Sequence, residues 1–202
     1  VYKDGECLAD LWGGTADPNT GTPWTKDTVS IVFSCTKAAT ALCAHLLVQR
    51  GQLNLNAPVA DYWPEYACNG KEDTTVLMML NHSAGVASFH DAAEPGALLD
   101  WDKAVSLLAA ETPWWEPGTR NGYHALTFGW TVGELVRRVS GKSLGDFFRE
   151  ELAEPMGTDF WIGLPEEHES RVAPMIPFKP EPGAPLSPFT QKMLTDPESL
   201  QH

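Results

Sequence analysis

Ser34 and Lys37 are the residues whose types and spacing point most directly to chemistry. They stand in Ser34-Cys35-Thr36-Lys37, which follows an apolar segment and opens an alanine-rich run. If that run is a helix, a spacing of three places both side chains on one face. A lysine held in apolar surroundings can accept the proton of a neighbouring serine, which makes the hydroxyl a nucleophile. The alternative is a serine that caps the helix and a lysine that extends its ammonium to solvent.

The backbone N–H of Ser34 is a second candidate group at this position. It lies in the predicted first turn, where N–H groups have no partner within the helix and carry the positive end of its dipole. We therefore expect this N–H to stabilise an oxyanion that forms when Ser34 attacks a carbonyl.

Tyr123 is the third candidate, because it follows a Pro/Gly-containing turn at 117–122 and precedes a predicted helix. A nearby ammonium favours the phenolate form of a tyrosine, and a phenolate can act as a general base. An aromatic side chain that only fills the core is the alternative. If the assignment is right, Ser34 Oγ, Lys37 Nζ and the Tyr123 hydroxyl converge at a cleft, within about 4 Å of one another.

Three residues near the tyrosine are predicted to bind substrate. Trp114 and Trp115 can line an apolar acyl pocket and His124 can contact the substrate, with packing in the core as the alternative for each. The stretch 166–169, Glu-Glu-His-Glu, is interpreted as a solvated turn rather than a metal site. The sequence therefore predicts neither a metal nor another cofactor.

The surrounding pattern predicts two N-terminal strands followed by helices. Residues 6–12 and 28–33 are predicted to be strands that pair across a long turn. The helix expected over 34–50 is apolar on nearly every side, so we predict that it is buried. Asp100 can cap a helix over 101–111.

Further along, the helical pattern continues and then gives way to prolines. The sequence predicts an amphipathic helix over 126–139 that ends at Gly141, and a helix capped by Ser143 that stops at Pro155. Residues 174–188 contain six prolines and are predicted to form an extended loop.

Charge and composition limit the partners that the chain can bind. The formal net charge is -13, and Arg137-Arg138 is the densest basic cluster, so nucleic-acid binding is not expected. No apolar run of membrane-spanning length is present, which favours a protein that does not cross a membrane. Four cysteines without Cys-x-x-Cys spacing favour free thiols and a cytoplasmic location. A small-molecule substrate is the predicted partner, and the oligomeric state stays open.

Four stretches together resemble the β-lactamase-related serine hydrolases, which include class C β-lactamases, D,D-peptidases and family VIII carboxylesterases. They span roughly residues 5–165 and are Ser34-Cys35-Thr36-Lys37, Leu80-Asn81-His82-Ser83-Ala84-Gly85-Val86, Pro117-Gly118 to Tyr123, and Gly141 with Glu154-Pro155-Met156-Gly157. The run from Tyr123-His124-Ala125 through Gly163-Leu164-Pro165 resembles the esterase branch most closely.

The resemblance implies an α/β (α+β) protein of β-lactamase/transpeptidase-like fold, with an antiparallel sheet and a helical subdomain. It implies that Ser34 is acylated, that Lys37 relays its proton and that Tyr123 activates serine and then water. We predict one incomplete domain over 1–202, with N-terminal strands and the nucleophile helix in 1–50 and a mainly helical part in 51–202. The C-terminal strands, and with them a second oxyanion donor, are expected to be missing.

One departure from the family pattern separates esters from lactams. The lactamase and peptidase pattern has Asn two residues after the tyrosine, where this chain has Ala125. The sequence therefore favours hydrolysis of short-chain carboxylic esters through an acyl-enzyme on Ser34. The alternatives are a β-lactamase, a D-aminopeptidase or D,D-peptidase, an acyltransferase on the same residues, or a non-catalytic penicillin-binding module.

Overall fold

The computed structural model describes residues 1–177 and 185–195, and the chain divides into two compact units. Residues 1–31 together with the segment from Arg171 onward form one unit, and residues 32–170 form the other. Each unit has its own secondary structure, with the short strands and a C-terminal helix in the first and the remaining helices in the second.

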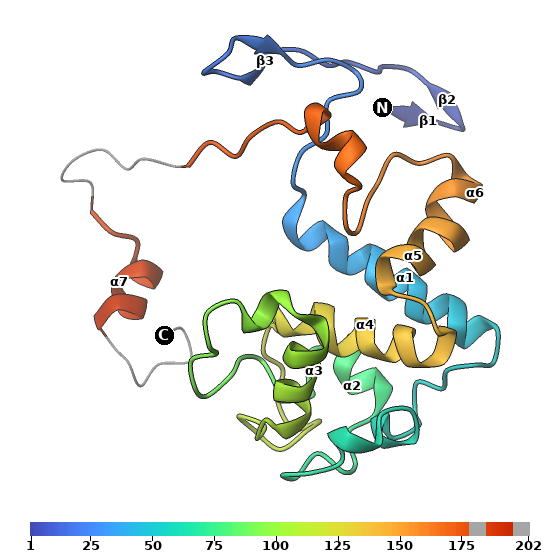
Figure 1. The fold of residues 1–202 in the computed structure, drawn as a ribbon, viewed down its shortest axis with the longest axis vertical. Coiled ribbons are helices and arrows are strands. Elements are labelled where there is room, and N and C mark those ends of the chain that lie inside the picture. Colours follow the sequence, from blue (N-terminus) through green and yellow to red (C-terminus); the bar gives the residue numbers. More distant parts are fainter. Residues whose placement is uncertain (178–184, 196–202) are drawn as a thin grey trace. The chain divides into compact units, whose positions relative to one another are not determined.

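The boundary predicted after residue 50 does not coincide with these units. The helix α1 (Thr36–Gln49) packs against α4 (Thr127–Ser140), so it belongs with the helices that follow it (Figure 1). The physical reason is burial, since the apolar side of α1 finds its partners in α4 and α5.

The N-terminal strands are shorter than predicted and pair locally. Strand β1 (Tyr2–Lys3) pairs antiparallel with β2 (Glu6–Cys7) across Asp4 and Gly5. Both turn residues have positive φ, 52° and 84°, as a two-residue hairpin turn requires. The strand predicted over 6–12 is therefore wrong beyond residue 7, because this turn folds it back onto its nearest neighbour.

The second predicted strand, over 28–33, is also wrong. In its place β3 (Thr15–Asp17) pairs antiparallel with β4 (Thr22–Pro23), and Val29 makes only an isolated parallel bridge with Val172. The turn residues 17–21, Asp-Pro-Asn-Thr-Gly, lie in the segment that was expected to link the two predicted strands. They instead close a small hairpin of their own, since a short loop costs less entropy to close than a long one.

Helix α1, which the sequence predicts to be buried, has one buried and one exposed side within the unit of residues 32–170. Leu42 is 56% exposed. The buried side consists of small residues and one leucine: Ala39, Thr40, Cys43, Ala44 and Leu47. The small side chains let α4 approach closely, whereas the opposite side meets no helix of this unit that would cover Leu42.

Two further helices follow the prediction closely. Helix α3 (Trp101–Ala110) is capped by the Asp100 side chain, which accepts a hydrogen bond from the Lys103 N–H at 3.0 Å. Helix α4 ends at Gly141, whose φ of 74° is the left-handed conformation that glycine adopts readily. The buried side of α4 packs on α1 and α3 and includes Phe128, Val132, Leu135 and Val136.

Shorter elements connect these helices. Helix α2 (Val76–Leu80) is capped by Thr75 and leads into the turn that contains His82. The remaining short turns of 3-10 type are η2 (Val59–Asp61), η3 (Pro64–Tyr66), η4 (Ala97–Leu99) and η6 (Glu166–Arg171). Within the described part of the chain, no helix has both the length and the apolar character that crossing a bilayer demands.

Ser143 caps α5 (Leu144–Phe148) as predicted. Its Oγ accepts a hydrogen bond from the Asp146 N–H at 3.1 Å and donates to Asp146 Oδ2 at 2.7 Å. The hydroxyl of Ser143 is therefore fully engaged by its own helix turn.

The predicted stop at Pro155 is wrong by two residues. A π-helical turn over Arg149–Ala153 follows α5 and leads into α6 (Glu154–Met156), which contains the proline. Pro155 lies near the end of this continuous helical run, where its missing N–H removes one backbone hydrogen bond without ending the helix. Gly157, with a φ of 61°, ends the helix instead.

The C-terminal segment contains a helix that the sequence analysis missed. Helix α7 (Pro188–Thr195) follows Ser187, whose Oγ accepts a hydrogen bond from the Thr190 N–H at 3.1 Å. A capping serine followed by proline is a helix-start signal, which the interpretation of 174–188 as an extended loop overlooked. Residues 173–177 and 185–187 have no regular structure, and the rest of that predicted loop before α7, residues 178–184, lies outside the described residues.

Candidate active site

A strained turn places Ser34 at the start of α1. Phe33 has a φ of 45°, which is uncommon for a bulky residue, and it begins the 3-10 turn η1 (Phe33–Cys35) that leads into the helix. No side chain caps this turn or the start of α1. Ser34 is exposed, so its hydroxyl is free to meet side chains from elsewhere in the unit.

The structure brings Ser34, Lys37 and Tyr123 together. The Tyr123 hydroxyl donates a hydrogen bond to Ser34 Oγ at 2.6 Å, and Lys37 Nζ donates to the same oxygen at 3.2 Å. The predicted spacing of three therefore does put the serine and lysine side by side, one turn apart on the helix. Tyr123 and Lys37 therefore both lie within hydrogen-bond distance of Ser34 Oγ, and whichever of them is deprotonated can take the serine proton.

Lys37 is held by the loop that carries Tyr123 as well as by its own helix. Its Nζ donates a hydrogen bond to the Ala125 carbonyl oxygen at 2.6 Å and lies 4.8 Å from the centroid of the Tyr123 ring. The ammonium therefore joins α1 to the tyrosine loop, and it places a positive charge beside the phenol.

This environment changes the acidity of Tyr123. The hydrogen bond with Ser34, the hydrogen bond with Lys37 and the charge of Lys37 lower the pKa of Tyr123 below its ordinary value. A lower pKa makes the phenolate, the basic form of the side chain, more accessible near neutral pH.

These three side chains meet at the surface of the unit of residues 32–170. Tyr123 is 56% exposed and Ser34 is exposed, while Lys37 is half-buried.

His82 lies next to Tyr123 in the site. From the sequence it was identified only as one residue of the motif from Leu80 to Val86. It adopts a φ of 66° in the turn after α2, and its ring centroid lies 5.0 Å from that of Tyr123. Its Nδ1 accepts a hydrogen bond from the His124 N–H at 3.1 Å, which places the proton of the neutral ring on Nε2. Burial and then the charge of Lys37 lower the pKa of His82, so the neutral ring is favoured.

His124 is placed differently from its predicted role as a substrate contact. Its side chain is 1% exposed, and Nδ1 donates to the Gly122 carbonyl oxygen at 2.7 Å. Burial lowers the pKa of His124 to about 4, so the ring is neutral at ordinary pH. A ring with so little exposed surface cannot touch a bound ester directly, although Nε2 is buried without a hydrogen-bond partner in the described structure.

The two tryptophans support the loops around the site. Trp115 packs so closely on Gly122 that a Cβ at that glycine would lie 2.4 Å from the indole, and its Nε1 donates to the Ser83 carbonyl oxygen at 3.3 Å. Trp114 is 41% exposed and stacks on His90 with ring centroids 3.9 Å apart. For Trp115 these contacts favour the packing alternative, while Trp114 keeps an exposed edge.

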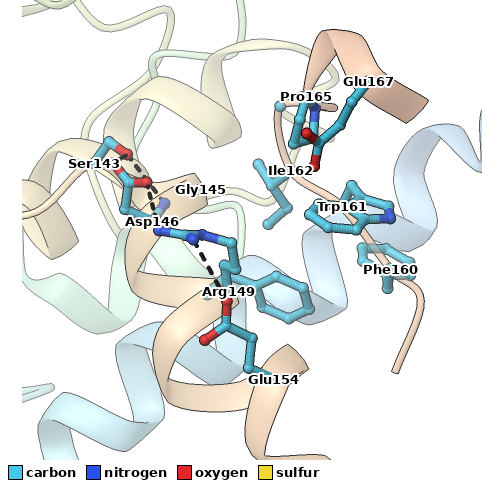
Figure 2. A pocket seen from close by; sticks show the side chains of 12 residues that line it. Ser143, Gly145, Asp146, Arg149, Glu154, Phe160, Trp161, Ile162, Pro165 and Glu167 are labelled. Atoms are coloured by element: carbon cyan, nitrogen blue, oxygen red, sulfur yellow. Dashed lines mark hydrogen bonds and ion pairs between the residues drawn. The ribbon is translucent and has the colours of Figure 1, made fainter. Parts of the chain in front are cut away.

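A separate pocket of about 460 Å³ lies elsewhere in the helical unit (Figure 2). None of the residues that line it is Ser34, Lys37 or Tyr123. Its serine, Ser143, is the helix cap already described, and its arginine, Arg149, is shared among carboxylates that include Asp146 and Glu154. The pocket therefore offers no free nucleophile and is not a second active site of the same kind.

The chain is similar to known proteins over most of its length. The family described as Beta-lactamase matches residues 1–195. The chain is 43% identical over 178 residues to the Esterase/beta-lactamase LipL of Mycobacterium tuberculosis, with 87% of this chain and 41% of LipL covered. A solved structure of a family VIII carboxylesterase has a TM-score of 0.80 at 47% identity, and 83% of this chain and 46% of that chain are covered. A penicillin-binding protein homologue from Caulobacter crescentus has a TM-score of 0.79 at 42% identity, with coverages of 82% and 44%.

The chain belongs to the beta-lactamase family and has the β-lactamase/transpeptidase-like fold, here as a helical unit and small antiparallel sheets. The resemblance to β-lactamase-related serine hydrolases inferred from the sequence motifs is confirmed. The chain spans less than half the length of each of these three relatives.

Proposed function

We propose that this chain carries the nucleophile and the general base of a serine hydrolase that cleaves short-chain carboxylic esters. The observation that carries the proposal is the shared contact on Ser34 Oγ, at 2.6 Å from the Tyr123 hydroxyl and 3.2 Å from Lys37 Nζ. Two similar proteins are named as an esterase and a carboxylesterase, which supports the same chemistry.

In the proposed acylation step, the Tyr123 phenolate removes the proton of Ser34 while Oγ attacks the ester carbonyl carbon. The new C–O bond converts the carbonyl to a tetrahedral oxyanion, which the Ser34 N–H stabilises as one donor. Tyr123 then gives the proton to the alkoxide as the C–O bond to the leaving alcohol breaks. Lys37 lies against both groups, where it stabilises the phenolate and keeps Oγ in place.

In the proposed deacylation step, water takes the position of the alcohol. Tyr123 removes one proton from the water, the hydroxide adds to the acyl carbon, and Ser34 leaves with the proton that Tyr123 returns. The products are the free carboxylic acid and the original serine, so no cofactor is needed to balance either step.

The preference for esters rests on position 125. A lactamase-type asparagine there would offer its amide to the acyl-amide of the substrate, whereas Ala125 offers only its backbone carbonyl, which already accepts the Lys37 ammonium. Esters lack that acyl-amide, so they lose no contact when the asparagine amide is absent. β-Lactam hydrolysis on the same three residues is the second candidate, because LipL is named as both an esterase and a β-lactamase.

The test is steady-state turnover of p-nitrophenyl butyrate and of nitrocefin by the complete natural protein. We expect butyrate turnover that disappears in the Ser34→Ala variant and persists in the matched Ser143→Ala variant. Burst acylation without turnover would point to a penicillin-binding module, and nitrocefin hydrolysis as fast as butyrate hydrolysis would reject the ester preference.

A further inference from the structure

His82 forms hydrogen bonds with the residues on both sides of Tyr123. Its carbonyl oxygen accepts a hydrogen bond from the Gly122 N–H at 3.1 Å, and its ring Nδ1 accepts one from the His124 N–H, also at 3.1 Å. Gly122 and His124, the residues on either side of Tyr123, are therefore both hydrogen-bonded to His82, which lies in another loop.

The backbone of His82 is in an unusual conformation for this purpose. Its φ of 66° lies in the left-handed region, which is uncommon for residues other than glycine, although asparagine, aspartate and histidine adopt it more often than most. A single residue in this turn supplies both the carbonyl and the ring acceptor to the 122–124 segment. Strained conformations of this kind persist where surrounding contacts hold them, and they cluster at functional sites.

The ring of His82 also forms the surface on which Tyr123 rests. Its centroid lies 5.0 Å from that of Tyr123 and 5.0 Å from that of Phe128. Lys37 Nζ lies within 4.8 Å of the Tyr123 ring centroid and 5.8 Å of the Phe128 centroid. The phenol is thus constrained by a neutral imidazole through ring contact and by an ammonium, and both hold it near Ser34.

We propose that His82 is a positioning residue, which fixes the backbone and ring of Tyr123 so that the tyrosine oxygen stays within hydrogen-bond distance of Ser34 Oγ. The proposal rests on the function proposed above, in which Tyr123 is the general base, and it assigns His82 to hold that tyrosine in position. His82 does not exchange protons with substrate. It acts through the Nδ1 acceptor, and loss of that acceptor lets the 122–124 segment drift while the fold of the helical unit stays.

Matched substitutions separate this role from general packing. In His82→Asn the amide oxygen stands near the position of Nδ1, and asparagine tolerates a left-handed backbone. In His82→Gln and His82→Leu no acceptor stands at that position, although the size of the side chain is similar. The comparison therefore tests the acceptor for the His124 N–H together with the left-handed backbone that asparagine tolerates.

The experiment measures kcat and KM for p-nitrophenyl butyrate, the rate of labelling by a fluorophosphonate probe, and thermal melting, all on the complete natural protein. We expect His82→Asn to stay within about threefold of the wild type. The Gln and Leu variants should lose about 10²-fold in kcat and in labelling rate, as a small displacement of a catalytic group does, with KM nearly unchanged.

Three results would overturn the proposal. The first is equal kcat in the Gln, Leu and Asn variants, and the second is a loss confined to KM. The third is loss of cooperative melting in both the Gln and Leu variants, which would make His82 a residue of the fold. If the wild type itself has no Ser34-dependent turnover, the proposed function fails and this proposal fails with it, whereas an active wild type with indifferent variants rejects the positioning role alone.

Discussion

Two serines of this chain begin helical segments and have a charged residue three positions later, yet they have different roles. Ser143 Oγ bonds to the N–H and the carboxylate of Asp146, and so closes the first turn of α5. Ser34 Oγ makes no capping bond and instead meets the ammonium of Lys37 and the hydroxyl of Tyr123. The same spacing therefore yields a structural cap when the partner is a carboxylate beside the helix N-terminus. It yields a nucleophile when the partner is an ammonium and a base approaches from another loop.

The backbone conformation at Ser143, and at Phe33 before Ser34, explains why the two hydroxyls have different partners. Ser143 has the extended conformation of a helix cap, with φ of -58° and ψ of 155°, so its side chain folds over the N–H groups of its own helix. Ser34 already lies in a helical turn, because Phe33 at a φ of 45° bends the chain one residue earlier. Its hydroxyl consequently projects away from the helix end and is available to Tyr123.

The largest expected effect is the loss of the nucleophile. Ser34→Ala should reduce ester turnover on the order of 10⁴-fold or more, because covalent catalysis has no substitute hydroxyl at this point. The melting temperature should change little, since Ser34 is exposed and caps nothing. Turnover by the Ser34→Ala protein comparable to that of wild type would show that Ser34 is not the nucleophile.

Lys37→Ala should come close to the same loss, because the residues of a catalytic unit are not additive. The residual activity should also shift in pH. Turnover needs the Tyr123 phenolate, so it rises as pH climbs through the pKa of Tyr123, which hydrogen bonds with Ser34 and Lys37 lower. Without the ammonium that rise should move to higher pH in a kcat/KM profile, whereas an unmoved rise would mean that Lys37 does not act on the tyrosine.

A smaller effect is expected at position 125, where the two activities diverge. Ala125→Asn should lower the ratio of p-nitrophenyl butyrate turnover to nitrocefin turnover about tenfold, because a buried polar contact contributes on the order of 1–3 kcal/mol. Ala125→Ser serves as the control, since it adds a polar atom without an amide. A ratio that stays unchanged in the asparagine variant would remove position 125 from the account of specificity.

The smallest effect on activity is expected at the other serine. Ser143→Ala should lower the free energy of unfolding by about 1 kcal/mol, a shift of about 2–4 °C in melting temperature for a chain of this size. Ester turnover per folded molecule should match the wild type. A Ser143→Ala protein with full stability but impaired turnover would reverse the roles assigned to the two serines.

The sequence predicted the site better than it predicted the sheet. Ser34 and Lys37 could be chosen because helical spacing is local, and the capped helices followed from Asp100 and Ser143 for the same reason. Tyr123 lies 89 positions from Ser34, and the resemblance to the family joined the two. The pairing of Val29 with Val172 could not be predicted, since it joins segments 143 positions apart and no local pattern encodes it.

The support of Tyr123 was equally hard to predict. His82 matters through a left-handed backbone and a bond to the N–H of His124, neither of which composition or periodicity encodes. His124 was predicted to touch substrate because it adjoins Tyr123. Its ring instead lies in the core, where it is 1% exposed.

The central claim, that Ser34 is the residue acylated, is tested most directly by identifying the labelled peptide. A fluorophosphonate probe should modify the complete natural protein once, and peptide mapping should locate the adduct at Ser34. The adduct should be absent from Ser34→Ala and present at the wild-type level in Ser143→Ala. An adduct on any other serine, or labelling that survives in Ser34→Ala, would contradict the account.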